Sequence, residues 1–482
     1  MSFLGIDVGT QGARALITDL DGSLLAFASM QFTGAEVPGL PAGWHEQYPR
    51  AWREAVLRVV AQVSADLKRV GGPPVQALSV TSTSGTLCLV DALGEPLCPA
   101  IMYGDTRSAD LSAEVQAAGA SLAERLGYRF NASFALSKLV WVGRAHPERL
   151  AQTRWCLSPA DLVAGWLTGE WGVSDWTNAL KMGYDLIDLR WPAFIEEALS
   201  LPARILPRVV APGTPIGAVS APAAEMTGLP IGARVVAGST DGTASQLASG
   251  AVSPGDWNST LGTTLVIKGV TRDLLHDPQG RIYSHRHLEG YWLPGGASST
   301  GAECLAERFG QDLDALNRAA LAHSPTGLVA YPLVRQGERF PFSRPRATGF
   351  LLGESPDWEV LYTAHLEGLA YVERLSYEVL RGLGAEVRDT IHVAGGATDS
   401  DAGLQIRADV LDRRLLAPVV PSGAMGAAVL AAHGHSGDGL SAVARRMVHH
   451  EREVTPRPGR HAMYVDGSER FVRACEERGY LP

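Results

Sequence analysis

Short apolar runs that end in glycine-rich polar turns recur along the chain and predict strands that lead into potential binding loops. Residues 3–6 are apolar, Asp7 follows them directly, and 9–12 reads Gly-Thr-Gln-Gly before a second apolar run at 13–18. The Asp-Gly pair at 21–22 is typical of a hairpin turn. A turn with outward backbone N–H groups and a carboxylate behind it suits a phosphate and its metal ion. An ordinary β-hairpin explains this stretch equally well.

The pattern then changes from strand to helix spacing. Within 51–68 the apolar positions fall on one helical face, and they are Trp52, Val56, Val59, Val60, Val63 and Leu67. Residues 75–97 predict a strand, a turn of small residues at 82–86, a second strand and a hairpin.

Two kinds of segment occur twice. Residues 235–247 (VVAGSTDGTASQL) and 392–405 (HVAGGATDSDAGLQ) each combine an apolar strand, a glycine-rich turn with an aspartate, and a helix start. Residues 259–270 (STLGTTLVIKGV) repeat the opening order of strand, Gly-Thr turn and strand. We therefore expect a duplicated α/β domain, with a cleft between the copies and two Gly-Thr turns that grip a nucleotide phosphate from both sides.

Bulk properties exclude several classes of protein. The chain of 482 residues is too long to fold around one hydrophobic core, so at least two domains are expected. A net charge of −9 argues against a nucleic-acid-binding protein, and no apolar run approaches the roughly 18 residues of a membrane span. The five cysteines are dispersed and include no CxxC pair, which indicates reduced thiols in a cytoplasmic protein. The sequence enters a predicted strand at once, so we expect no signal peptide.

Common motifs for phosphate and acyl chemistry are missing. The chain has no G-x-x-x-x-G-K-[ST] sequence, so it lacks a P-loop, and it has no G-x-S-x-G nucleophile elbow. Any phosphate chemistry must therefore use another scaffold.

Six motifs in order carry a resemblance to a known family. They are GIDVGTQGARALITD, AGSTDGTASQLASG, STLGTTLVIK, YPLVRQGERFPFSRPRATGFLLG, VAGGATDSDAGLQIRADVL and GAMGAAVLAAHG. Together they resemble the FGGY carbohydrate kinases of the actin/hexokinase/Hsp70-like ATPase superfamily, from Gly5 to about Gly434. The resemblance implies an α/β fold of duplicated ribonuclease H-like (actin/hexokinase-type ATPase) domains with a central cleft. It implies a sugar-binding and catalytic domain over 1–249 and a nucleotide-binding domain over 250–482.

The resemblance also implies roles for individual residues. Asp241 would be the general base that accepts the proton of the sugar hydroxyl, and Asp7 would face Mg²⁺ through water. From the residues alone, Asp241 is as readily a helix N-cap. The implied sugar-binding residues are Ser84, Gly85, Tyr103, Asp105 and Asp241. The implied nucleotide-binding residues are Thr10, Gln11, Gly12, Gly262, Thr263, Thr264, Gly301, Gly395, Gly396 and Ala397.

The implied activity is ATP-dependent phosphorylation of a ketopentose, D-ribulose or D-xylulose, to its 5-phosphate, with ATP and Mg²⁺ as cofactors. The Thr-Ser-Gly-Thr turn at 83–86 resembles the D-ribulose kinase branch. Alternatives are a kinase for another polyol or small metabolite, and a non-catalytic actin-like ATP-binding protein. We expect no nucleic-acid or membrane partner, and a homodimer is left open. Ser422 stands where many relatives carry Glu, and Glu338 of the Gly-Glu-Arg segment is interpreted as an internal ion-paired brace.

Overall fold

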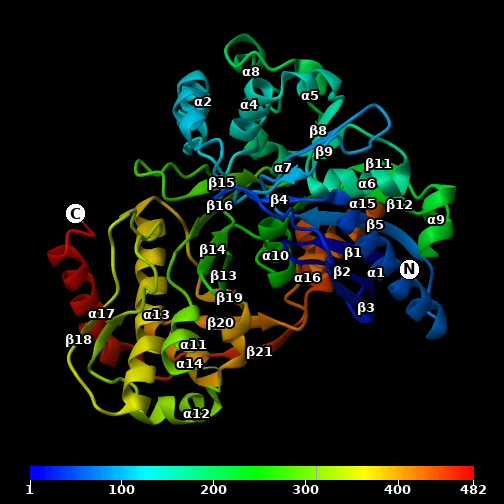
Figure 1. Ribbon diagram of the computed structural model, residues 1–482. Coiled ribbons are helices and arrows are strands. Elements are labelled where there is room, and N and C mark those ends of the chain that lie inside the picture. The colour runs from blue at the N-terminus through cyan, green and yellow to red at the C-terminus, as the bar shows by residue number, and fades with distance from the viewer. Residues whose placement is uncertain (311, 482) are drawn as a thin grey trace. The chain divides into compact units, whose positions relative to one another are not determined.

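The computed structural model describes residues 1–310 and 312–481, which form two compact units (Figure 1). The first unit comprises Met1–Ala248, His285–Gly290 and Ser422–Val448, and the second comprises Ser249–Ser284, Tyr291–Pro421 and His449–Pro482. Two segments beyond residue 250 therefore belong to the first unit. Within the described residues, no helix is both long and apolar enough to span a membrane.

A six-stranded mixed sheet organises the first unit. Its order is β11-β12-β5-β1-β2-β3, with strands at Pro215–Ala218, Arg234–Thr240, Val75–Ser82, Ser2–Val8, Gly12–Asp19 and Leu24–Gln31. β1 and β12 both run parallel to β5, whereas β2, β3 and β11 pair antiparallel with their neighbours. The predicted turn at 9–12 and hairpin at 21–22 are confirmed, because they join β1 to β2 and β2 to β3.

The two faces of β1 carry different partners, as the alternation of side chains in a strand requires. Leu4, Ile6 and Val8 belong to the buried core that also contains Trp52 and Val56. The last two residues lie on α1 (Pro49–Arg69), which packs on β2 and β3 and confirms the helix predicted over 51–68. This unit also contains α6 (Pro159–Thr168), α9 (Ala221–Thr227) and α10 (Asp241–Ser249).

The other face of β1 receives α15 (Gly423–Ser436) at very short range. A Cβ added at Gly5 would lie 1.8 Å from the carbonyl oxygen of Ala424 and 2.6 Å from the amide nitrogen of Ala428. Ser422 caps this helix, because its Oγ accepts a hydrogen bond from the Ala424 amide at 3.3 Å. The absence of a side chain at Gly5 thus allows α15 to pack directly on the central strand.

The second unit contains a seven-stranded sheet with the order β15-β16-β14-β13-β19-β20-β21. The strands lie at Tyr283–Arg286, Trp292–Ala297, Leu265–Gly269, Trp257–Leu261, Thr390–Ala394, Arg414–Pro418 and His450–Val454. β13 pairs antiparallel with β14 and parallel with β19, as β1 does with β2 and β5. The predicted repeat of strand, Gly-Thr turn and strand is therefore confirmed, because the two copies have the same strand pairings.

The second predicted repeat holds for local structure but not for position in the sheet. β12, which precedes Asp241, is one strand removed from β1, whereas β19, which precedes Asp399, pairs directly with β13. The topological counterpart of β19 is therefore β5. Asp241 and Asp399 therefore follow strands that occupy different positions in their sheets, although both segments have the order strand, glycine turn and helix.

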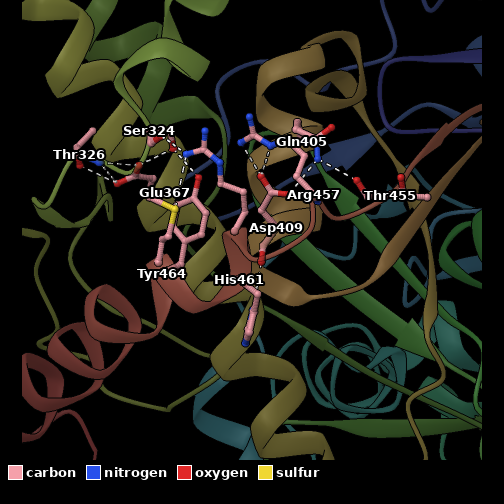
Figure 2. Close-up of polar contacts among 11 residues, drawn as sticks. Ser324, Thr326, Glu367, Gln405, Asp409, Thr455, Arg457, His461 and Tyr464 are labelled. Carbon is pink, nitrogen blue, oxygen red and sulfur yellow. Dashed lines mark hydrogen bonds and ion pairs between the residues drawn. The ribbon is translucent and has the colours of Figure 1, made fainter.

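Buried polar contacts fix the C-terminal helix α17 (Arg460–Glu477) to α13 (Trp358–Gly382) and α14 (Asp401–Leu411), as Figure 2 shows. Glu367 accepts hydrogen bonds from the hydroxyls of Ser324 and Thr326, each at 2.7 Å, and Ser324 Oγ lies 2.7 Å from Tyr464 OH. Asp409 accepts from Nε and Nη2 of Arg457 at 2.9 and 2.6 Å. These contacts, with the one between His461 and the Asp409 carbonyl, link α17 and the residues before it to α13 and α14.

We predict that Gly5→Ala lowers the thermal midpoint of the protein, because the new methyl group must displace backbone atoms of α15. Overpacking of this kind costs about 1–3 kcal/mol of unfolding free energy, and the short contact distances place Gly5 at the upper end. Gly104→Ala is the control, since no atom lies within 4 Å of the Cβ it would add. Equal midpoints for the two variants in thermal denaturation would contradict the packing of α15 on β1.

Candidate active site

Candidate functional side chains of the first unit lie where its parallel strands end. β1, β5 and β12 lie side by side and point the same way, so their carboxyl ends share one edge of the sheet, where open α/β sheets bind ligands. Asp7 lies near the end of β1, Ser84 just after β5, and Asp241 directly after β12. The structure thus brings together three of the residues predicted for catalysis, sugar binding and the metal.

Asp7 is a buried carboxylate, and one of its two oxygens lacks a hydrogen-bond partner among the described residues. Arg14 Nη1 lies 3.3 Å from Oδ2, whereas Oδ1 is buried and has no hydrogen-bond partner among the described residues. Burial raises the pKa of Asp7 to about 6, the charge of Asp241 adds to the rise, and Arg14 opposes it. The start of α15 closes the site, since a Cβ at Gly423 would lie 3.2 Å from the Asp7 carboxylate.

The turn at 9–12 is tied to two other parts of the first unit. The Gly9 amide donates to the Gly12 carbonyl at 2.9 Å, and Gln47 Nε2 donates to the Thr10 carbonyl at 2.9 Å. The Thr10 hydroxyl donates to Tyr103 OH at 3.3 Å. A phosphate-binding candidate and a sugar-binding candidate therefore touch. Gln11 is exposed and, with Thr10, lines a hollow of about 440 Å³.

Asp241 begins α10 and is half-buried. Its Oδ1 accepts a hydrogen bond from the Gly242 amide at 2.6 Å. Thr177 Oγ1 accepts from the Thr240 amide at 2.9 Å, and the hydroxyls of Thr240 and Thr243 lie 3.0 Å apart. The backbone just before Asp241 is thus held by a hydroxyl, and a side-chain hydrogen bond links the residues that flank Asp241 at 240 and 243.

The turn after β5 offers one free hydroxyl. Thr83 Oγ1 and Thr86 Oγ1 bond to each other at 2.9 Å, but Ser84 Oγ is buried without a partner among the described residues. Gly85 adopts φ +89°, and a Cβ there would lie 2.4 Å from the Ser133 carbonyl and 2.8 Å from Lys181 Cδ. Buried hydroxyls are normally hydrogen-bonded, so Ser84 is a strong candidate to bind a polar ligand.

Lys181 approaches this turn and its charge acts on Lys138; both lysines were missed by the sequence analysis. Lys181 Nζ donates to the Ser84 carbonyl at 3.3 Å, and Lys138 Nζ donates to the Ala132 carbonyl at 2.7 Å. Burial lowers the pKa of Lys181 to about 8 against the opposing charge of Asp241. Burial also lowers the pKa of Lys138 to about 7, and the charge of Lys181 contributes. The signal in the sequence was a single lysine inside the otherwise uncharged run 176–184.

Asp105, a predicted sugar-binding residue, is buried, and both of its carboxylate oxygens have partners within the protein. Its carboxylate accepts hydrogen bonds from the His45 amide at 2.6 Å and from Nε and Nη2 of Arg107 at 2.9 and 2.7 Å. The Arg107 guanidinium carbon lies 3.8 Å from the centroid of the Trp44 ring and bonds to Glu46. Both oxygens of Asp105 are therefore engaged inside the protein, and the residue braces the segment that carries Tyr103.

In the second unit, three predicted nucleotide-binding segments converge on one turn. A Cβ at Gly301 would lie 2.2 Å from the Thr263 carbonyl oxygen, and one at Gly395 would lie 2.5 Å from the Leu261 carbonyl oxygen. The Ala302 amide donates to the Gly262 carbonyl at 2.8 Å. The predicted residues concerned are Gly262, Thr263, Thr264, Gly301, Gly395, Gly396 and Ala397. Glycine is needed at two of these positions because backbone meets backbone there.

Glu338 holds the loop that precedes Gly301. It is 2% exposed and accepts from Ser298 Oγ at 2.9 Å, Thr300 Oγ1 at 2.8 Å and Tyr331 OH at 2.9 Å. The residue is an internal brace, as predicted, but its partners are hydroxyls and backbone amides and not a paired cation.

The environment of Asp7 fits a Mg²⁺ ion. Mg²⁺ retains several waters and takes one or two protein carboxylates together with substrate phosphates, and the buried, unpartnered Oδ1 is a suitable acceptor for a metal-bound water. No cluster of three or more histidine, cysteine or acidic side chains that could hold a metal by itself occurs in the part of the chain described.

Comparison with known proteins identifies the family of the chain. Residues 2–248 match the N-terminal domain, and residues 258–435 the C-terminal domain, of the FGGY family of carbohydrate kinases. Xylulose kinase from Lactococcus lactis is 27% identical over 96% of this chain and 94% of its own length. Gluconokinase from Bacillus licheniformis is 26% identical over 89% and 86%.

A solved structure of a sugar kinase is also similar to this chain. The crystal structure of xylulose kinase from Rhodospirillum rubrum has a TM-score of 0.87 and 28% identity over 99% of both chains. The fold is the two-domain α/β sugar kinase fold with mixed sheets, of the actin/hexokinase type. The family matches cover most of the sequence, and the chain belongs to the FGGY family of carbohydrate kinases.

Proposed function

We propose that the protein phosphorylates a ketopentose, D-ribulose or D-xylulose, at its 5-hydroxyl with Mg-ATP. The observation that carries this proposal is the pair of buried, unpartnered oxygens, Asp7 Oδ1 and Ser84 Oγ, at the edge of the sheet where Asp241 begins α10. The former suits hydrated Mg²⁺ and the latter suits a neutral polyol. Membership of a sugar kinase family supports both assignments.

Asp241 is assigned the general base. It would accept the proton of the sugar hydroxyl while the oxygen–phosphorus bond forms to the γ-phosphorus and the bond to ADP breaks. Ser84, Gly85 and Tyr103 would bind the sugar, Lys181 would donate to one of its oxygens, and Asp105 would hold the segment that carries Tyr103 through its bond with the His45 amide. The close contacts of Gly85 with Ser133 and Lys181 support this grouping.

Nucleotide binding is assigned to backbone-rich turns in both units. In the first unit the residues are Thr10, Gln11 and Gly12. In the second they are Gly262, Thr263, Thr264, Gly301, Gly395, Gly396 and Ala397. When bound, Mg²⁺ neutralises phosphate charge, and Asp7 would hold it through water. Convergence of the three second-unit segments supports this assignment.

A sugar acid is a second candidate substrate. Lys181 is half-buried beside Ser84, Lys138 is buried close enough for the charge of Lys181 to act on it, and neither lysine makes an ion pair among the described residues. A carboxylate on the substrate would compensate these charges. One relative, from Bacillus licheniformis, is named gluconokinase. A ketopentose instead uses Lys181 as a donor to a neutral oxygen.

A panel of acceptors with an ADP readout tests the proposal. We expect D-ribulose or D-xylulose to give the highest kcat/KM, D-gluconate to rank lower, and glycerol to be poor because it leaves several polar groups of the pocket unmatched. Highest activity with D-gluconate would select the sugar-acid alternative. Highest activity with glycerol would contradict both assignments of the sugar pocket.

Lys181→Met should raise the sugar KM about 10- to 100-fold, the value of one hydrogen bond to a charged group, and leave the ATP KM within about twofold. Since the ammonium is protonated below its pKa of about 8, the wild-type sugar KM should rise as the pH increases above that value. The variant should lack this dependence.

Lys68→Met is the matched control, because Lys68 is exposed in the last turn of α1. It should leave both KM values and their pH profiles unchanged. A sugar KM that rises equally with pH in wild type and Lys181→Met would remove Lys181 from the sugar site.

A further inference from the structure

A second polar cavity lies in the second unit, away from the predicted nucleotide turns. It has a volume of about 210 Å³ and is lined by Arg374, Tyr377, Glu378, Arg381, Ile391, Leu411, Asp412, Arg413 and His461. We call it the arginine pocket. Ile391 is the second residue of β19, whereas Gly395 follows the other end of that strand, about 13 Å away at strand spacing. The pocket is therefore separate from the nucleotide-binding candidates.

Three arginines reach the pocket from two directions. Arg374 and Arg381 lie seven residues apart on α13, which places them on one helical face. Arg413 comes from the turn between α14 and β20. His461, at the start of α17, completes the wall; its Nδ1 lies 3.2 Å from the Asp409 carbonyl oxygen (Figure 2). Elements distant in the sequence thus present cations to one cavity.

The hydrogen-bonding capacity of these guanidinium groups is only partly used. Arg374 Nε bonds to Glu378 at 3.0 Å, and Arg413 Nη1 donates to the Asp412 carbonyl at 2.8 Å. Arg374 Nη1 and Arg413 Nε are buried and have no acceptor among the described residues. A buried donor without an acceptor is costly and calls for a missing partner.

Charge supports a negatively charged partner. Glu378 and Asp412 supply two negative charges against three arginines, so one positive charge remains uncompensated within the lining. Asp389 is 3.9 Å from Arg413 but 99% exposed, where its effect is screened by solvent. Burial lowers the pKa of Arg381, repulsion from Arg413 and Arg374 lowers it further, and the charge of Glu378 opposes this change. An oxyanion would relieve this repulsion.

We propose that the arginine pocket binds the phosphate group of a small metabolite, or free phosphate. Guanidinium groups bind tetrahedral oxyanions through paired N–H donors, and the two buried, unused donors supply such bonds. The volume of 210 Å³ equals about seven waters at roughly 30 Å³ each, which leaves room for a short carbon chain beside the phosphate. The bound anion bridges α13, the α14–β20 turn and α17.

Calorimetric titration of the full-length protein tests this site. The protein is saturated with Mg-ADP, so that the nucleotide turns are occupied, and inorganic phosphate or ribose 5-phosphate is added at constant ionic strength. We expect saturable binding that Arg381→Gln and Arg413→Gln each weaken at least tenfold. Tighter binding of ribose 5-phosphate identifies a phosphorylated metabolite, and equal binding identifies phosphate itself; either supports the site.

Arg346→Gln is the matched control, since Arg346 is an exposed arginine of the same unit outside the pocket. It should bind both anions as the wild type does. Unchanged kcat in all three variants verifies that they fold. Absence of binding in the wild type, or equal affinities in wild type, Arg381→Gln and Arg413→Gln, would overturn the proposal.

Discussion

The close approach of α15 to β1 is the constraint on which the rest of the first unit depends. Gly5 lets backbone meet backbone along the central strand, and Gly423 lets the start of the helix rest on the Asp7 carboxylate. This packing removes Asp7 from solvent and raises its pKa to about 6. Because burial disfavours the charged form of Asp7, a nearby cation would stabilise the ionised carboxylate.

The proposed site lies where the fold leaves buried polar atoms without hydrogen-bond partners. Most buried polar groups in folded proteins have partners, yet Asp7 Oδ1 and Ser84 Oγ have none among the described residues. Neighbouring groups are by contrast fully engaged, such as Asp105 with Arg107 and Thr83 with Thr86. On the proposed function, this contrast distinguishes the candidate ligand-binding residues from the residues that hold them in place.

Local patterns in the sequence predicted local structure well. The turn at 9–12, the hairpin at 21–22 and the face of α1 depend on neighbours in the chain, and all three are confirmed. The repeated Gly-Thr hairpins also have matching topology, but the similarity of 235–247 to 392–405 did not extend to sheet position. Strand order is set by long-range pairing, which a short repeat does not encode. Lys181, Gln47 and the arginine pocket were missed for the same reason, because their partners lie far away in sequence.

The central claim is that Asp241 accepts the proton during phosphoryl transfer while Asp7 serves the metal. Turnover and calorimetric binding of Mg-ADP by Asp241→Asn test it most directly, with Asp110→Asn as an exposed control on the same unit. The account predicts that Asp241→Asn loses at least about 10²-fold in kcat, the lower end of a general-base contribution, and keeps its affinity for Mg-ADP. Near-normal turnover of Asp241→Asn with the best sugar would contradict it.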